Sequence, residues 1–199
     1  IPLKSATYLH VSRNGKYLYC NTVAGVQVYE IGPDGDLTNI NKIDMDGLRC
    51  HHMVNDYTGK YLFLAGFHDG RLTMIHTHQD GRLGSQMDEV YHKRQGGIRD
   101  RSWHPQLTCV RMTRDNKYVC AVDNGLDQVA MYRIDTENNK LIPSEILRMG
   151  REVGPRSMHF SKDGRFAFIL CEISCSIRVY AYHKRHDGRS SFEFIQELT

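Results

Sequence analysis

Asn14-Gly15-Lys16-Tyr17-Leu18-Tyr19-Cys20 opens a pattern that the chain repeats three more times. The later copies are Thr58-Gly59-Lys60-Tyr61-Leu62-Phe63-Leu64, Asp115-Asn116-Lys117-Tyr118-Val119-Cys120-Ala121 and Asp163-Gly164-Arg165-Phe166-Ala167-Phe168-Ile169. Each copy joins a glycine or asparagine, which tolerates the positive φ of a tight turn, to an aromatic and apolar run that favours a β-strand. Measured at this glycine or asparagine, successive copies are 44, 57 and 48 residues apart. The chain is therefore built from an internal repeat.

Each copy lies inside a longer unit that contains three further stretches of period two. One precedes the turn, as Thr7 to Val11 does in the first unit, and one follows the apolar run, as Val26 to Tyr29 does. The fourth stretch begins at Leu37, Leu83, Leu141 or Phe192. Alternation with a period of two gives a strand one buried face. We therefore predict one four-stranded antiparallel sheet per unit, and the lack of helical periodicity argues against a parallel α/β fold.

Units of about 40–50 residues with four strands are typical of a β-propeller, because one such sheet cannot bury both faces without neighbours. We expect an all-β fold in a single propeller domain or fragment over residues 1–199. The approximate blades are 6–46, 48–92, 104–150 and 154–199.

The composition is that of an ordinary globular protein. The chain has 199 residues, of which 26 are basic and 23 acidic, for a net charge of +3, and 40% are hydrophobic. No apolar run reaches the length of about 18–20 residues that spans a bilayer. A small net charge without a long basic cluster gives little support to nucleic-acid binding. We expect no nucleic-acid or membrane partner.

The cysteines favour a reducing compartment. The chain has 6 of them and no C-x-x-C pair, which is not the density of a disulfide scaffold. Cys20, Cys109 and Cys120 lie inside apolar runs, where a free thiol behaves as a small hydrophobic group. We expect reduced thiols, a cytoplasmic location and no signal peptide in the residues given.

Three segments resemble the propeller lactonases, a family that includes bacterial 6-phosphogluconolactonases and fungal carboxy-muconate lactonizing enzymes. The first is Trp103-His104-Pro105-Gln106 followed by Asp123-Asn124-Gly125-Leu126-Asp127-Gln128-Val129. The second is Val153-Gly154-Pro155-Arg156-Ser157-Met158-His159-Phe160, and the third is Glu172 ahead of Ser176-Ile177-Arg178-Val179-Tyr180. The resemblance implies a seven-bladed parent, so we expect this chain to be part of a longer protein. A complete four-bladed propeller is the alternative.

The resemblance also implies a catalytic set of His104, Arg156 and Glu172. Lactone hydrolysis needs a base to activate water, cationic donors for the oxyanion and a proton source for the leaving alkoxide. His104 is expected to start the first strand of the third unit, and Arg156 to bind an anion at the axis. The alternatives are a loop histidine, a surface arginine in a turn, and a glutamate that serves only as the partner of an arginine. Many relatives have a second histidine where this chain has Gln106.

Other residues have smaller expected roles. Trp103 is a candidate wall of the substrate pocket, and Asp123 and Asp127 are expected at most to support the site through turn hydrogen bonds. His51-His52, His76 and His78 suggest a metal site, but no Cys, Asp or Glu joins them at ligand spacing. We predict no metal and no cofactor.

Three functions are consistent with these features. The first is hydrolysis of 6-phosphogluconolactone, a small sugar-acid lactone, in the pentose phosphate pathway. The second is a lactonizing cyclase that acts on a carboxylated muconate. The third is a non-catalytic propeller that binds proteins, because this fold hosts many unrelated functions. The sequence does not indicate an oligomeric state.

Overall fold

The computed structural model describes residues 3, 5–45, 47, 49–93, 104–184 and 190–199. All regular secondary structure in these residues is β-strand. The strands are β1 (Tyr8–Val11), β2 (Tyr17–Thr22), β3 (Gly25–Ile31), β4 (Leu37–Ile43), β5 (Cys50–Asn55), β6 (Tyr61–Gly66), β7 (Arg71–Thr77), β8 (Leu83–Tyr91), β9 (Leu107–Met112), β10 (Tyr118–Asp123), β11 (Gln128–Asp135), β12 (Lys140–Arg148), β13 (Pro155–Phe160), β14 (Phe166–Cys171), β15 (Ser176–Lys184) and β16 (Ser190–Leu198).

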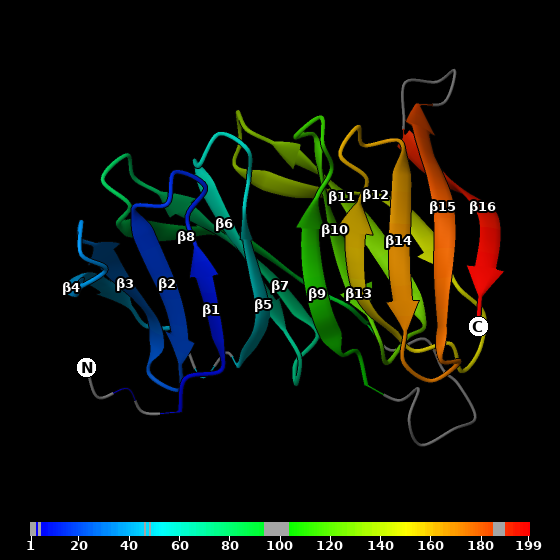
Figure 1. The fold of residues 1–199 in the computed structure, drawn as a ribbon, viewed down its shortest axis with the longest axis horizontal. Helices are drawn as coiled ribbons and strands as arrows, with labels where there is room; N and C mark the ends of the chain where they lie inside the picture. Colours follow the sequence, from blue (N-terminus) through cyan, green and yellow to red (C-terminus); the bar gives the residue numbers. More distant parts are fainter. Residues whose placement is uncertain (1–2, 4, 46, 48, 94–103, 185–189) are drawn as a thin grey trace.

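The strands form four antiparallel sheets, each made of four strands that are consecutive in the chain. We call them blades 1 to 4; they span residues 8–43, 50–91, 107–148 and 155–198. Figure 1 shows the blades side by side in chain order, from blue at the left to red at the right. The prediction of an all-β propeller with four-stranded blades is confirmed.

The hairpin between the first two strands of each blade has the turn chemistry that the repeat indicated. The turn residues Gly15, Gly59, Asn116 and Gly164 have φ of 72°, 74°, 58° and 76°. In blade 1 the Ser12 hydroxyl accepts the backbone N–H of Tyr17 at 2.9 Å, and equivalent side chains make the same bond in the later blades. The turn residue is therefore a fixed reference point for comparing blades.

Apolar side chains fill the space between neighbouring blades. Blades 1 and 2, 2 and 3, and 3 and 4 each share one buried cluster. Phe63 of β6 and Val119 of β10, for example, are fully buried in the cluster between blades 2 and 3. Contacts with both neighbours bury every residue of β6 and β10, so the core lies between sheets rather than within one.

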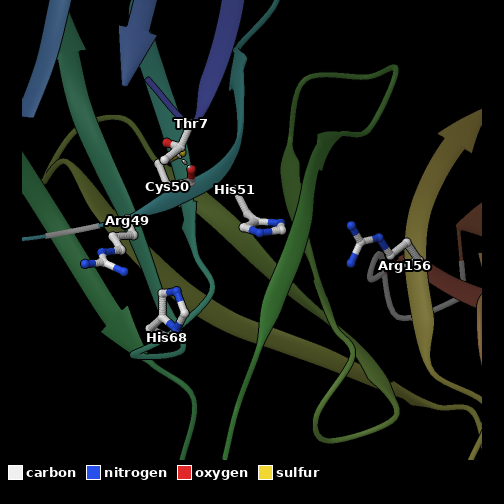
Figure 2. A pocket seen from close by; sticks show the side chains of 6 residues that line it. All are labelled: Thr7, Arg49, Cys50, His51, His68 and Arg156. Carbon is white, nitrogen blue, oxygen red and sulfur yellow. Dashed lines mark hydrogen bonds between the residues drawn. The ribbon is translucent and has the colours of Figure 1, made fainter. Parts of the chain in front are cut away.

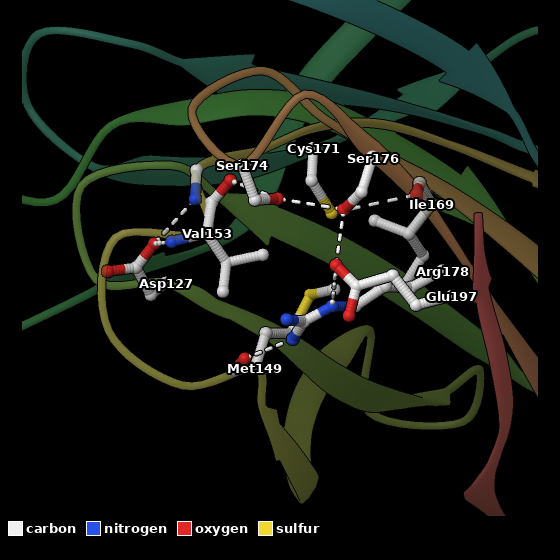
Figure 3. A network of polar contacts seen from close by, with 10 residues as sticks. Asp127, Met149, Val153, Ile169, Cys171, Ser174, Ser176, Arg178 and Glu197 are labelled. Carbon is white, nitrogen blue, oxygen red and sulfur yellow. Dashed lines mark hydrogen bonds and ion pairs between the residues drawn. The ribbon is translucent and has the colours of Figure 1, made fainter. Parts of the chain in front are cut away.

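Polar contacts also join blades at their periphery. Arg178 of β15 pairs with Glu197 of β16 at 3.3 Å and donates a hydrogen bond to the carbonyl of Met149, which follows β12. Figure 3 shows this guanidinium between the glutamate and the Met149 carbonyl. Blade 4 is thus tied to blade 3 by polar contacts as well as by the apolar cluster.

The first strands of the blades are neighbours in space: β1 contacts β5, β5 contacts β9 and β9 contacts β13. These inner strands line the axis of the propeller. Residues at their beginnings gather at one end of the axis, which we call the strand-start end. Residues near the turns that follow them gather at the other, which we call the hairpin end.

Candidate active site

Three inner strands contain a β-bulge at their second residue. The antiparallel pairing leaves out one residue in each of β5, β9 and β13. These residues are His51, Thr108 and Arg156. A bulge turns a side chain away from the ordinary alternation of a strand, so blades 2, 3 and 4 each present one such side chain at the strand-start end.

A cavity of about 450 Å³ opens at this end of the axis. Its described lining consists of Thr7, Arg49, Cys50, His51, His68 and Arg156. Figure 2 shows the side chains of His51 and Arg156 pointing toward one another from β5 and β13. Its size is that of a small-molecule pocket, and its guanidinium and imidazole groups suit an anionic ligand.

Arg156 and Glu172, two of the predicted site residues, are in direct contact. Arg156 Nε lies 3.5 Å from Glu172 Oε2, with side-chain exposures of 43% and 40%. Asn124 Nδ2 donates to the other carboxylate oxygen, Oε1, at 2.9 Å, and to the Pro155 carbonyl at 3.3 Å. An exposed ion pair contributes little to stability. The contacts with Arg156 and Asn124 instead hold the Glu172 carboxylate in one orientation beside the cavity.

Asp127 fixes the loop that carries Arg156. Its Oδ1 accepts the backbone N–H groups of Val153 at 3.1 Å and Gly154 at 2.7 Å, and its Oδ2 accepts that of Glu152 at 3.0 Å. Figure 3 shows the carboxylate against this loop. Because the loop leads directly into β13, Asp127 positions the backbone from which the guanidinium projects.

Asp123 forms a buried pair with His92. His92 Nδ1 lies 2.6 Å from Asp123 Oδ2, and the two side chains are 2% and 0% exposed. The other oxygen, Oδ1, accepts the backbone N–H groups of Gln106 at 2.9 Å and Leu126 at 3.1 Å. Asp123 therefore fastens the segment before β9 to the end of β10.

His104 lies outside the sheet. The prediction that it starts the first strand of the third unit is wrong, because β9 begins at Leu107. The bonds to Asp123 keep the preceding residues in a loop, and the His104 carbonyl oxygen would lie 2.0 Å from a Cβ at position 125, so this approach requires Gly125. His104 is exposed and is absent from the described lining of the cavity. Trp103, the predicted pocket wall, lies outside the described residues.

His51 faces Arg156 in the cavity. Its ring stacks on Phe67 with a centroid separation of 4.5 Å. Burial lowers the pKa of His51, and the charge of Arg156 lowers this pKa further. A neutral imidazole can accept a proton at one nitrogen and donate one at the other.

The other histidine pair is close in space but does not form a metal cluster. The rings of His76 and His78 have centroids 4.8 Å apart. In the part of the chain that the structure describes, no three His, Cys, Asp or Glu side chains are grouped to hold a metal ion. Within the same residues, no helix is long and apolar enough to cross a membrane.

His51 lines the cavity and Asn124 orients Glu172, and the sequence patterns assigned neither residue to this site. Their distance in sequence from the repeated turn residue is a signal that could have identified them. The axial residues Thr7, His51, Thr108 and Arg156 each lie eight residues before the turn glycine or asparagine. Phe67, Asn124 and Glu172 each lie eight residues after it. On this spacing Thr108, rather than His104, is the blade 3 counterpart of Arg156.

Comparison with known proteins identifies the relatives of this chain. The family model described as "Lactonase, 7-bladed beta-propeller" matches residues 1–199. An uncharacterized protein of Staphylococcus epidermidis is 32% identical over 194 residues, which cover 94% of this chain and 54% of that protein. The 6-phosphogluconolactonase of Bacillus subtilis is 27% identical over 186 residues, which cover 91% of this chain and 52% of the enzyme. The chain thus spans about half the length of these relatives.

A solved structure has the same fold. It is a Bacteroides uniformis protein, provisionally named as a 6-phosphogluconolactonase, that superposes with a TM-score of 0.85 at 24% sequence identity. The match covers 100% of this chain and 60% of that chain. The four blades are therefore arranged in the same way as part of a larger propeller.

Proposed function

Because the chain belongs to the lactonase family of seven-bladed propellers, we propose that the full-length protein hydrolyses a lactone, with 6-phosphogluconolactone as substrate. The observation that carries the proposal is the contact between Arg156 and Glu172 beside an axial cavity with further cationic groups. This arrangement combines an anion-binding group with a carboxylate that can accept a proton. We also propose a cytoplasmic location, which the six free cysteines support.

In the proposed reaction Glu172 takes a proton from water as the water oxygen attacks the lactone carbonyl carbon. Arg156 stabilises the negative charge that develops on the carbonyl oxygen or holds the phosphate of the substrate. The ring C–O bond then breaks, and the leaving alkoxide takes up a proton. The products are an open-chain acid and an alcohol on the same molecule.

Two histidines compete for the role of passing the proton that Glu172 has taken from water on to the alkoxide, by accepting a proton at one ring nitrogen and donating one from the other. His104 is the active-site histidine that the family resemblance implies. His51 is the candidate that faces Arg156 in the cavity. Comparing His104→Ala with His51→Ala assigns the role to the histidine whose loss lowers kcat more.

The test is hydrolysis of 6-phosphogluconolactone by the full-length protein, measured against spontaneous ring opening. Arg156→Ala should lower kcat/KM about tenfold to a hundredfold, and more for the phosphorylated lactone than for its unphosphorylated counterpart. Glu172→Gln keeps the shape of the side chain and should lower kcat with little change in KM. If wild-type turnover does not exceed the spontaneous rate, the proposal fails and a binding scaffold is the better description.

A further inference from the structure

A second cavity lies at the hairpin end of the axis, opposite the candidate active site. Its volume is about 180 Å³, and all four blades contribute to its lining. The lining includes Arg13 from blade 1, Tyr57 from blade 2, Arg111 and Arg114 from blade 3, and His159 from blade 4. Three arginines thus converge on a space that the proposed hydrolysis does not use.

The repeat explains why basic residues from separate blades meet here. The residues five positions before the turn glycine or asparagine are His10, Val54, Arg111 and His159. Those two positions before it are Arg13, Tyr57, Arg114 and Lys162. Equivalent positions of successive blades form layers around the axis, so residues far apart in the sequence make one basic cluster.

The arginines of this cavity are held in place by their surroundings. The guanidinium carbon of Arg13 lies 3.7 Å from the centroid of the Tyr57 ring, and that of Arg114 lies 5.8 Å from it. Arg111 Nε donates to the Met158 carbonyl at 2.9 Å. A guanidinium has five N–H donors, so the interactions described leave donors for a ligand.

The positive charge of the cavity is not balanced by an ion pair in the part of the chain described. None of the salt bridges there involves Arg13, Arg111 or Arg114. The nearby carboxylates accept hydrogen bonds from their own hairpins: Asp56 from the Tyr61 N–H, and Asp115 from Thr113 and Lys117. This positive charge also acts on a lining residue. Burial lowers the pKa of His159, and the charge of Arg111 lowers this pKa further.

We propose that this cavity binds a small oxyanion, namely a phosphate group. Guanidinium groups match the geometry of phosphate oxygens and bind them through charge-assisted hydrogen bonds. A volume of about 180 Å³ equals the liquid volume of about six water molecules. It accommodates inorganic phosphate or the phosphate end of a small ester. The proposal does not depend on lactone hydrolysis.

The test is a calorimetric titration of the full-length protein with inorganic phosphate, with ionic strength held constant by sodium chloride. The protein carries Arg156→Ala so that the candidate active site contributes little to phosphate binding, and the wild type is titrated alongside. Arg13→Ala/Arg114→Ala removes two lining guanidiniums. Arg111 is left unchanged because its hydrogen bond joins β9 to β13. Glycerol phosphate, titrated in parallel, distinguishes esterified from free phosphate.

Lys162→Ala is the matched control. Lys162 occupies the same position of the repeat as Arg114 and is exposed, but it is absent from the described lining. We expect the double variant to bind phosphate at least about tenfold more weakly and Lys162→Ala to change binding less than about twofold. Three results would each overturn the proposal. They are undetectable phosphate binding to the unaltered cavity, equal losses of affinity in the double variant and in Lys162→Ala, and no loss of affinity in the double variant. If inorganic phosphate binds more tightly than glycerol phosphate, the cavity prefers free phosphate; the reverse order indicates a phosphate ester.

Discussion

At the residue scale, Asp127 illustrates how one side chain positions a functional group that it does not touch. Its carboxylate accepts three consecutive backbone N–H groups, and its own backbone has φ of 51°. Asp127→Ala removes the acceptors and strains the backbone, whereas Asp127→Gly removes the acceptors alone. We expect both to lower the free energy of unfolding by about 2–3 kcal/mol and also to lower kcat/KM.

Asp127→Asn is the control, because it keeps one acceptor oxygen and a side chain that tolerates positive φ. It should retain most of the stability in denaturant unfolding. An unaffected glycine variant would show that strain, not hydrogen bonding, explains the loss in Asp127→Ala.

His52 makes the stability of the protein depend on pH. It is 7% exposed, and burial, aided by the charge of Arg111, lowers its pKa to about 3. The unfolded chain therefore binds a proton near pH 6.5 that the folded chain does not, so stability is fully present above that pH and is lost as the pH falls toward 3. We expect a loss of about 2 kcal/mol from this group between pH 7 and pH 5.

Denaturant unfolding at the two pH values checks this prediction. His52→Gln cannot titrate, so its loss of stability over this range should be smaller by about the same 2 kcal/mol. His183→Gln, on the exposed part of β15, should leave the loss unchanged. A His52 variant with the wild-type pH dependence would contradict the assignment.

At the element scale, the repeat predicts strands well and positions of side chains less well. Turn residues such as Gly59 and Asn116 report local backbone preferences, and the structure has the predicted strand next to each of them. The bulges at His51 and Thr108 depend on pairing between strands, which no local pattern reveals. Arg156 and Glu172 were predicted from the resemblance, whereas the contact between them depends on how the loops of blade 4 fold.

The bond from Asn124 to Glu172 joins the ends of two strands, β10 and β14, in adjacent blades. Without the amide donor, the carboxylate loses one of the contacts that orient it. We expect Asn124→Ala to lower kcat for lactone hydrolysis about tenfold with a small change in KM. Asn124→Asp, which puts a second carboxylate there, should be at least as harmful. If Asn124→Ala keeps wild-type kcat, the amide has no positioning role.

At the scale of the whole molecule, blade 4 differs from blades 2 and 3. β6 and β10 are buried on both faces. In β14 the side chains that face blade 3, such as Ile169, are buried, while Phe168 and Leu170 on the opposite face are 41% and 47% exposed. Since the chain spans about half of its relatives and the family has seven blades, we expect a further blade to cover this face in the full-length protein.

Leu170→Glu tests that expectation in the full-length protein. If a further blade packs on this face, the substitution buries a carboxylate without a partner, and the free energy of unfolding should fall by roughly 3 kcal/mol or more. Ile146, at 45% exposure on the outermost strand of blade 3, is a matched control, because an outer strand faces solvent in a propeller whatever its number of blades. Ile146→Glu should change stability by less than about 0.5 kcal/mol. Equal effects of the two substitutions in denaturant unfolding would mean that the Leu170 face is open to solvent, and a fifth blade could not then be packed against it.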